Sequence, residues 1–335
     1  MTRALGLYSG GLDSMIAAKL MLEQGIEVTA LNFSTPFFGS ERARITAEQL
    51  GIELIVEDIT EEHFEIVRSP RFGFGKNMNP CMDCHTMMYR LAGQMMEREG
   101  YDFIFTGEVL GQRPFSQNKH SIRQIAEKSG YEDDILRPLC ARLFKPTRPE
   151  REGLVDRDRL LDISGRSRRR QIALAKKWGL EAHSGSAGGC LLTDPQFSAR
   201  LREAMRDDPD MPPRDVEILK YGRHFRLTPG CRLAVGKTQG ENITITKVAR
   251  EKSYVLATVE SVPSPTAAFT CDPNEEQMRL AARIIGRYAD IPSDEEFTLI
   301  VWNEANDWRK EITAKPFSPE ESKKYLIGLK AKGGG

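Results

Sequence analysis

The stretch SGGLDS (residues 9–14) places two hydroxyls, two glycines and one carboxylate between an apolar run and a helix-like segment. Gly10 and Gly11 let backbone N–H groups converge on an anion, and the helix that follows presents its positive end. Ser9 and Ser14 add hydroxyl donors. The lysine that a Walker loop uses on the β- and γ-phosphates is missing, so γ-phosphate transfer is not expected. We expect Asp13 to act through Mg²⁺ and to hold a leaving pyrophosphate.

A second set of chemically capable residues consists of cysteines. Cys81 and Cys84 are spaced i, i+3 after Pro80, which places both thiols in the first turn of a helix. The helix dipole there is expected to lower their pKa and favour thiolate. Cys190, which ends the glycine-bearing stretch SGSAGGC, is the third candidate.

Three thiolates with one vacant position suit a [4Fe–4S] cluster whose fourth iron is open. Structural zinc needs four ligands, so His85, Asp83 or Cys140 would have to complete a zinc site. A zinc site, a persulfide and disulfide relay, and inert cysteines remain open as alternatives.

Composition sets the outer limits on function. The chain has 335 residues, with 48 basic and 48 acidic side chains, so no net charge draws it to nucleic acid or to an anionic membrane. No apolar run approaches the ~20 residues that span a bilayer, and the first residues lack a signal-peptide pattern. We therefore expect a cytoplasmic protein without membrane contact. In that compartment disulfides are rare, so Cys140, Cys231 and Cys271 are predicted to be core or surface residues.

The apolar pattern predicts two domains. Up to about residue 205, strand-like and helix-like segments alternate, which indicates an α/β fold with a doubly wound parallel sheet. A second, smaller α+β domain is expected over residues 216–332, after a proline- and aspartate-rich linker at 206–215. The expected strands are 4–8, 28–33, 52–59, 102–108, 232–236, 242–249 and 254–262, and the expected helices are 14–25, 41–51 and 84–100.

The SGG-x-DS pattern after a strand resembles the PP-loop of ATP pyrophosphatases, which adenylate a substrate oxygen and release pyrophosphate. The stretch TGEVLGQ (106–112) resembles the TGE-x-x-GQ stretch of 4-thiouridine synthases, and ILRPL (135–139) matches another short family stretch. The resemblance implies a PP-loop/HUP-like fold, with ATP and Mg²⁺ as cofactors. It also implies that Phe33 lies beside the adenine, that Gly107 contacts the nucleotide through its backbone, and that Gln112 or Arg113 reaches the phosphates.

PP-loop tRNA thiolases are also similar to this chain in pairing a C-x-x-C with one distant, glycine-flanked cysteine. In some members the three cysteines hold a [4Fe–4S] cluster, and in others two of them run a persulfide relay. The resemblance thus implies an ATP-dependent sulfurtransferase that replaces a base carbonyl oxygen by sulfur. Cys81, Cys84 and Cys190 would handle the sulfur, which a cysteine desulfurase or inorganic sulfide would donate. A homodimer is one open arrangement.

Two segments are candidates for binding RNA, with tRNA as the expected substrate. The helical stretch 165–179 carries Arg168, Arg169, Arg170, Lys176 and Lys177, which form either a solvated basic face or a phosphate-contacting patch. In the second domain, YGRHFRL followed by VGKTQGEN resembles the NFACT-R type of RNA-binding domain. That resemblance implies an RNA face made of the side chains Arg223, His224, Arg226 and Lys237.

Two other classes of function remain open. One is a PP-loop enzyme that adenylates a small molecule, which would exchange ATP and pyrophosphate without RNA. The other is a non-catalytic RNA-binding adaptor with a vestigial nucleotide site, which would bind RNA equally well without Asp13.

Overall fold

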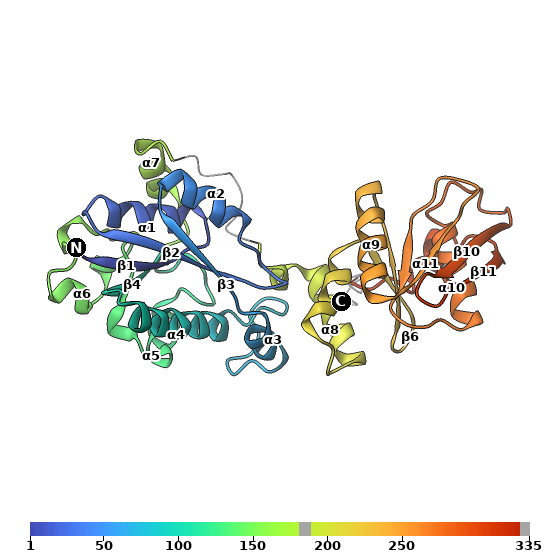
Figure 1. Cartoon of the computed structure of the whole chain (residues 1–335), viewed down its shortest axis with the longest axis horizontal. Helices are drawn as coiled ribbons and strands as arrows, with labels where there is room; N and C mark the ends of the chain where they lie inside the picture. Colours follow the sequence, from blue (N-terminus) through green and yellow to red (C-terminus); the bar gives the residue numbers. More distant parts are fainter. Residues whose placement is uncertain (181–188, 329–335) are drawn as a thin grey trace, which may run out of the picture. The chain divides into compact units, whose positions relative to one another are not determined.

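The computed structural model describes residues 1–180 and 189–328, which form two compact units, 1–193 and 194–335. Each unit has its own sheet (Figure 1). Within the described residues, no helix is both long and apolar enough to cross a bilayer.

The first unit is built on a parallel sheet of five strands in the order β3-β2-β1-β4-β5. The order reverses direction between β1 and β4, and a crevice forms at such a switch point at the carboxyl ends of the strands. The strands are β1 (Arg3–Leu7), β2 (Glu27–Ser34), β3 (Glu53–Asp58), β4 (Phe103–Thr106) and β5 (Ile135–Leu136). The predicted doubly wound α/β fold is therefore confirmed.

Helices cover both faces of this sheet (Figure 1). One apolar core contains side chains of α1 and α2, and the other contains side chains of α4 and α5. The helices are α1 (Leu12–Leu22), α2 (Glu41–Leu50), α3 (Thr60–Arg68), α4 (Cys81–Glu99), α5 (Lys119–Ser129), α6 (Arg148–Arg151) and α7 (Arg169–Lys177). Single-turn 3-10 helices occur at η1 (Glu132–Asp134), η2 (Ala141–Leu143), η3 (Arg157–Arg159) and η4 (Leu191–Thr193).

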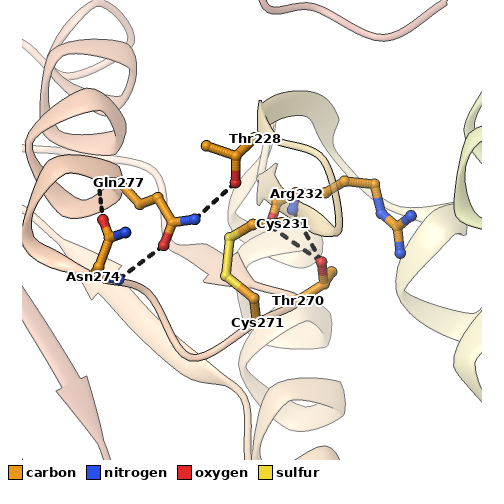
Figure 2. The surroundings of a disulfide bond; sticks show 7 residues. All are labelled: Thr228, Cys231, Arg232, Thr270, Cys271, Asn274 and Gln277. Atoms are coloured by element: carbon orange, nitrogen blue, oxygen red, sulfur yellow. Dashed lines mark hydrogen bonds between the residues drawn. A yellow bond between two sulfur atoms is a disulfide. The ribbon is translucent and has the colours of Figure 1, made fainter. Parts of the chain in front are cut away.

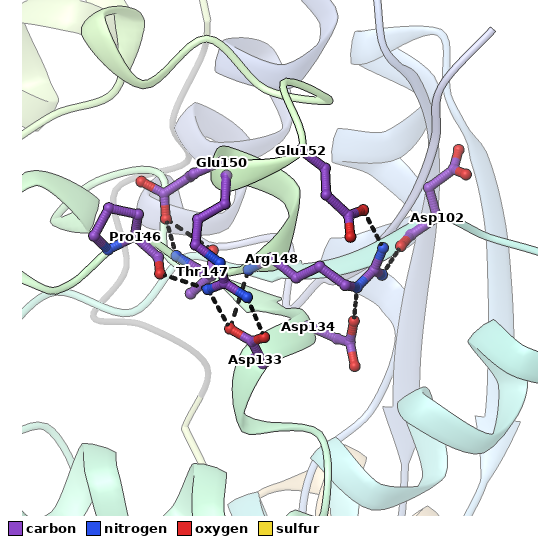
Figure 3. A network of polar contacts seen from close by, with 9 residues as sticks. Asp102, Asp133, Asp134, Pro146, Thr147, Arg148, Glu150 and Glu152 are labelled. Atoms are coloured by element: carbon purple, nitrogen blue, oxygen red, sulfur yellow. Dashed lines mark hydrogen bonds and ion pairs between the residues drawn. The ribbon is translucent and has the colours of Figure 1, made fainter.

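A polar network fixes the segment that follows β5 (Figure 3). Arg148, at the start of α6, donates to Asp134 at 2.6 Å, to Glu152 at 2.9 Å and to the carbonyl of Asp102. Thr147 and Glu150 form a capping box at the same helix start. The network joins α6 to the chain just before β4 and β5.

The second unit is an antiparallel sheet of six strands in the order β11-β10-β8-β9-β7-β6. Helix α10 packs against β6, β10 and β11, and α9 packs against β8 and β9. The strands of the second unit are β6 (Arg223–Thr228), β7 (Cys231–Val235), β8 (Val255–Thr258), β9 (Ala267–Phe269), β10 (Phe297–Asn303) and β11 (Trp308–Ala314). Its helices are α8 (Pro195–Asp207), η5 (Pro213–Lys220), α9 (Gln239–Lys252), α10 (Glu275–Gly286) and α11 (Pro319–Lys323).

The strand predicted at 242–249 is wrong, because these residues lie inside α9. Thr238 caps the helix by accepting a hydrogen bond from the Glu241 N–H at 3.2 Å. The β-branched alternation favoured a strand, but Ile245 is buried and Ile243 is exposed. The buried positions are Ile245, Val248 and Ala249, which is helical spacing.

The linker predicted at 206–215 and the boundary at 205 also differ from the structure. Residues 206–207 end α8, residues 213–215 begin η5, and α8 belongs to the second unit. The buried Arg200 of α8 donates to the carbonyls of Leu219 and Gly222 at 2.9 and 3.0 Å. Asp207 pairs with Arg232 at 3.3 Å. These contacts make the segment part of the packed unit rather than a flexible connection.

The prediction that Cys231 and Cys271 are unpaired was wrong, since the structure joins them in a disulfide (Figure 2). The antiparallel register of β7 and β9 pairs Leu233 with Phe269, and extending it by two residues sets Cys231 opposite Cys271. Their Cα atoms lie 5.2 Å apart. A sequence separation of 40 residues gave no hint of this pairing, which depends on which strands are neighbours.

The boundary at Asp194 can be tested with two fragments. Residues 194–335 are expected to unfold in one cooperative thermal transition. Residues 216–335 lack α8 and therefore leave the Arg232 side chain, which is only 11% exposed, without Asp207, so their melting temperature should be lower by about 10 °C or more. Circular dichroism measures the thermal unfolding of both fragments. Equal melting temperatures would contradict the assignment of α8 to the second unit.

Candidate active site

The phosphate-loop sequence lies where β1 ends and α1 begins. The backbone of Gly10 has φ +69°, and a Cβ there would lie 2.6 Å from the Ala43 nitrogen, so glycine is required. Gly11 caps α1 without a side-chain acceptor, which leaves the first N–H groups of the helix for a ligand. The hydroxyl of Ser14 donates to the Gly11 carbonyl at 2.9 Å and lies 3.5 Å from that of Ser9.

The loop after β4 approaches the phosphate loop very closely. A Cβ on Gly107 would lie 2.6 Å from the Ser14 nitrogen, so only glycine fits at this position. From the same loop, Gln112 donates to Asp13 Oδ2 at 2.7 Å, and Arg168 of the α7 cap lies 3.9 Å from the same oxygen. The other oxygen of Asp13 is buried and has no hydrogen-bond partner in the described part of the chain.

The paired cysteines, Cys81 and Cys84, and the distant Cys190 border the same cavity of about 260 Å³ as the phosphate loop. Cys81 and Cys84 come from the first turn of α4, as predicted. Cys190 is held by the segment after it, since the Leu191 N–H donates to the Phe37 carbonyl at 3.0 Å and the Met78 N–H to the Leu192 carbonyl at 3.2 Å. The rest of its glycine stretch, residues 184–188, lies outside the described residues.

Most of the predicted nucleotide residues also line this cavity. They are Ser9, Gly11, Asp13, Ser14, Phe33, Gly107 and Arg113. Gly10 is not among the lining residues and instead shapes the turn, while Gln112 reaches Asp13 rather than the cavity wall. Cys140 is buried elsewhere, and its thiol donates to the Glu108 carbonyl at 3.3 Å.

The expectation that the helix start lowers the thiol pKa values is wrong for the protein without ligands. Burial raises the pKa of Cys81, which the positive charge of Arg113 only partly offsets. Burial also raises the pKa of Cys190 to about 12, and it raises that of Cys84 well above the ordinary range. The cavity therefore holds neutral thiols, since desolvation outweighs the helix dipole.

Glu108, a buried acid that was not singled out from the sequence, links α4 to the segment that follows β5. Glu108 accepts hydrogen bonds from His85 on α4 and from Arg137 after β5, both at 3.1 Å. Burial alone would raise the pKa of Glu108, but the His85 hydrogen bond and the Arg137 charge hold it at about 2. The position of Glu108 in the TGE stretch, at the carboxyl end of a strand, is the sequence signal that could have identified it.

His63 on α3 also lines the cavity and was missed. It packs against Phe37 and Phe38, and burial lowers its pKa to about 4, so its imidazole is neutral near pH 7. A lone histidine in an otherwise ordinary helix gives no sequence signal for such a position.

One of the predicted RNA contacts is excluded by its position, and the others differ in their surroundings. His224 is 0% exposed and cannot form part of an RNA face; its prediction is wrong because its strand turns this side chain into the core. Arg226 pairs with Glu203 of α8, and Arg223 lies over the Tyr288 ring at 4.6 Å. Lys237 is exposed. Arg170 pairs with Asp162 at 2.7 Å, whereas Arg169 is exposed without an acidic partner in the described residues.

The fold and this crevice define an α/β domain whose SGGLDS stretch lies at the switch point of its parallel sheet. Residues 1–142 match the family of the thiamine biosynthesis protein ThiI, and residues 222–326 match the NFACT protein RNA binding domain. Residues 1–142 are thus similar to the ThiI family and residues 222–326 to the NFACT RNA-binding domain, and both resemblances read from the sequence are confirmed.

Curated relatives carry the name "Probable tRNA sulfurtransferase". The protein of Oceanobacillus iheyensis is 31% identical over 42% of this chain and 35% of its own length. That of Methanothermobacter thermautotrophicus is 32% identical over 48% and 41%. That of Caldanaerobacter subterraneus is 27% identical over 48% and 50%. The chain therefore spans about a third to a half of the length of these relatives.

Among solved structures, a 4-thiouridine synthetase in complex with RNA and bound ATP has a TM-score of 0.41 and 21% identity. The match covers 56% of this chain and 44% of that one.

The Glu108 cluster gives a pH-dependent prediction. Because the folded-state pKa of Glu108, about 2, lies below the ordinary value of 4.5, its contribution to stability is complete above pH 4.5 and declines as the pH falls toward 2. Glu108→Gln leaves Arg137 buried and unpaired, so it should lower the free energy of unfolding by about 3 kcal/mol near pH 7. It should also flatten the pH dependence between 4.5 and 2.

Urea titrations at several pH values measure both effects. Glu97→Gln, at an exposed position of α4, serves as the control. Equal pH dependence in the Glu108 variant and the wild type would contradict the role assigned to this carboxylate.

Proposed function

We propose that this protein is an ATP-dependent RNA sulfurtransferase that thiolates a base, with tRNA as the substrate class. The observation that carries the proposal is the shared cavity, since the phosphate loop and three unpaired cysteines border one space of about 260 Å³. An enzyme that both activates a carbonyl oxygen and replaces it by sulfur needs these two sets of groups beside each other. The relatives named as tRNA sulfurtransferases support the same activity.

In the activation step, the base carbonyl oxygen attacks the α-phosphate of ATP, and pyrophosphate leaves. The start of α1 and the hydroxyls of Ser9 and Ser14 would bind the phosphates, and Phe33 would lie beside the adenine. Mg²⁺ fits the site on one structural ground: the buried Oδ1 of Asp13, which lacks a partner in the described residues, is a hard oxygen ligand. Mg²⁺ would offset the negative charge of the leaving pyrophosphate.

In the sulfur step, a sulfide adds to the activated carbon and AMP leaves. The described residues contain no group of three or more His, Cys, Asp or Glu side chains that converges on a single metal ion. A [4Fe–4S] cluster makes a different demand, because each cysteine binds its own iron, so the ligands surround a space rather than meet at a point. Cys81, Cys84 and Cys190 border such a space, and a cluster bound there would supply an open iron to carry sulfide.

The positive charge of Arg113 assists this step. It lowers the pKa of both Cys81 and Cys190 against the effect of burial, so it favours the thiolate forms that bind iron or sulfur. The hydrogen bond between the buried Glu108 and the half-buried His85 would hold the start of α4, and with it the first two cysteines, in position. A persulfide relay on two of the cysteines is the alternative, and it would need neither iron nor the third thiol.

RNA would bind on the basic surface beside this cavity. Arg166, Arg169, Lys176 and Lys177 are exposed, and none has an ion-pair partner within the described residues. Such cations contact phosphates without reading sequence. The NFACT RNA-binding domain would add a second contact, for which Lys237 is the exposed candidate. A cysteine desulfurase or inorganic sulfide as donor, and a cytoplasmic location, belong to the same proposal.

A small-molecule adenylating enzyme is the second candidate function, which the match to a thiamine biosynthesis family favours. It would exchange radiolabelled pyrophosphate into ATP in the absence of RNA. An exchange that requires tRNA supports the sulfurtransferase, and exchange without it supports the rival.

Cys190→Ser should abolish thiolation while ATP binding stays within about twofold, because Cys190 lies outside the phosphate loop. After anaerobic purification, the wild type should contain about four irons per chain, and the variant should lose most of them. Cys140→Ser is the control, since Cys140 is also a free cysteine but does not line the cavity. Mass spectrometry of digested tRNA measures the thiolated nucleoside.

Full thiolation by the Cys190 variant would refute the role of the third cysteine. Thiolation by a wild type that holds no iron after reconstitution would replace the cluster by the persulfide relay.

A further inference from the structure

A line of hydrogen bonds connects the Asp13 carboxylate to helix α7. Gln112 donates its Nε2 to Asp13 Oδ2 at 2.7 Å, and its Oε1 accepts a hydrogen bond from Nε2 of Gln171 at 3.1 Å. Gln171 is 0% exposed and belongs to the inner side of α7, which packs against α1. Asp13 lies in the first turn of α1, so the relay joins the two helices through the loop that follows β4.

The direction of this relay is fixed by charge. A carboxylate only accepts hydrogen bonds, so Gln112 must turn its NH₂ group toward Asp13 and its oxygen toward α7. Gln171 must then present its own NH₂ group to that oxygen. Either amide turned around would set two oxygens against each other, so Gln171 determines where the Gln112 amide can lie.

The relay is incomplete in the protein without ligands. Oδ1 of Asp13 and Oε1 of Gln171 are buried, and neither has a hydrogen-bond partner in the described residues. Buried acceptors of this kind are costly, so they are satisfied where a ligand or a bound water supplies donors or a cation. The two ends of the relay are therefore both sensitive to what binds nearby.

The other side of α7 faces solvent and carries the basic surface. Arg169, Ile172 and Lys176 follow one another at i, i+3 and i+7, and Ile172 is 58% exposed. Arg168, the residue that caps α7, lies 3.9 Å from Asp13 Oδ2. A short helix thus presents its outer side to a polyanion while two of its residues reach the Asp13 carboxylate, one directly and one through Gln112.

We propose that α7 couples RNA binding to the ATP site, with Gln171 as a positioning residue that acts on Asp13 through Gln112. The inference rests on the proposed function for the identity of the two ligands. RNA phosphates that contact Arg169 and Lys176 change the position of α7. This movement changes the length of the hydrogen bond between Gln171 and Gln112. Because Gln112 also holds Asp13, the orientation of the Asp13 carboxylate toward Mg²⁺ changes with it. Because the coupling is thermodynamic, Mg·ATP must change RNA affinity by the same factor.

The test is a binding cycle on the full chain. The Kd for the Mg²⁺ complex of ATP, in the form of its non-cleavable α,β-methylene analogue, is measured by equilibrium dialysis without and with saturating unfractionated tRNA, for the wild type and Gln171→Met. Methionine keeps the unbranched shape but removes both hydrogen-bonding groups. In the wild type, tRNA should change this Kd by about fivefold or more. In the variant the change should fall below twofold, while the Kd for tRNA itself, measured by filter binding, stays within twofold.

Two further measurements separate positioning from a merely structural role. Gln171→Met should weaken binding of Mg·ATP more than binding of ATP in EDTA, because only the former uses Asp13. Gln49→Met, an exposed glutamine on α2, should behave as the wild type does. Should the methionine variant fail to fold, Gln171→Asn keeps the polar group but is one methylene too short to reach Gln112, and the same losses are expected.

The possible failures can be told apart. An undiminished tRNA effect in a folded Gln171 variant would overturn the relay, and so would a wild type that binds tRNA without any change in Mg·ATP affinity. A wild type that binds no tRNA would instead refute the proposed function, and the coupling with it.

Discussion

The backbone of Gly107 lies against the first turn of α1, and the rest of the site depends on this approach. A Cβ at Gly107 would lie 2.6 Å from the Ser14 nitrogen, so no other residue lets β4 deliver its loop this close to the phosphate loop. The same loop carries Glu108 and Gln112. Glu108 is hydrogen-bonded to His85 of α4, and Gln112 donates a hydrogen bond to Asp13 of α1. One close backbone contact thus sets the cysteine helix and the phosphate loop around a common cavity.

Burial then decides the chemistry of that cavity. Neutral thiols and a neutral His63 line it, while the Glu108 carboxylate stays ionised because His85 and Arg137 offset its desolvation. The thiols stay neutral even though the charge of Arg113 lowers the pKa of Cys81 and Cys190, because burial is the larger effect.

The sequence was sufficient for the parallel sheet, because strand and helix periodicities alternate clearly up to β4, and for the position of SGGLDS between β1 and α1. It was insufficient where the outcome depends on which elements become neighbours. The disulfide follows from the pairing of β7 with β9, and the position of α8 follows from the buried Arg200. In α9, tertiary packing and a Thr238 cap overrode β-branched propensity. The prediction of lowered thiol pKa values failed because desolvation is a property of the folded cavity, which the spacing of cysteines in the sequence does not reveal.

The central claim is that activation by ATP and transfer of sulfur occur in one cavity. The most direct test is the stoichiometry of a single reaction with tRNA, ATP and a sulfide donor under anaerobic conditions. Pyrophosphate is measured by an enzymatic assay, AMP by chromatography, and the thiolated nucleoside by mass spectrometry. The account predicts equal amounts of all three, with no ADP. Formation of ADP and orthophosphate, or release of pyrophosphate without any thiolated nucleoside, would contradict it.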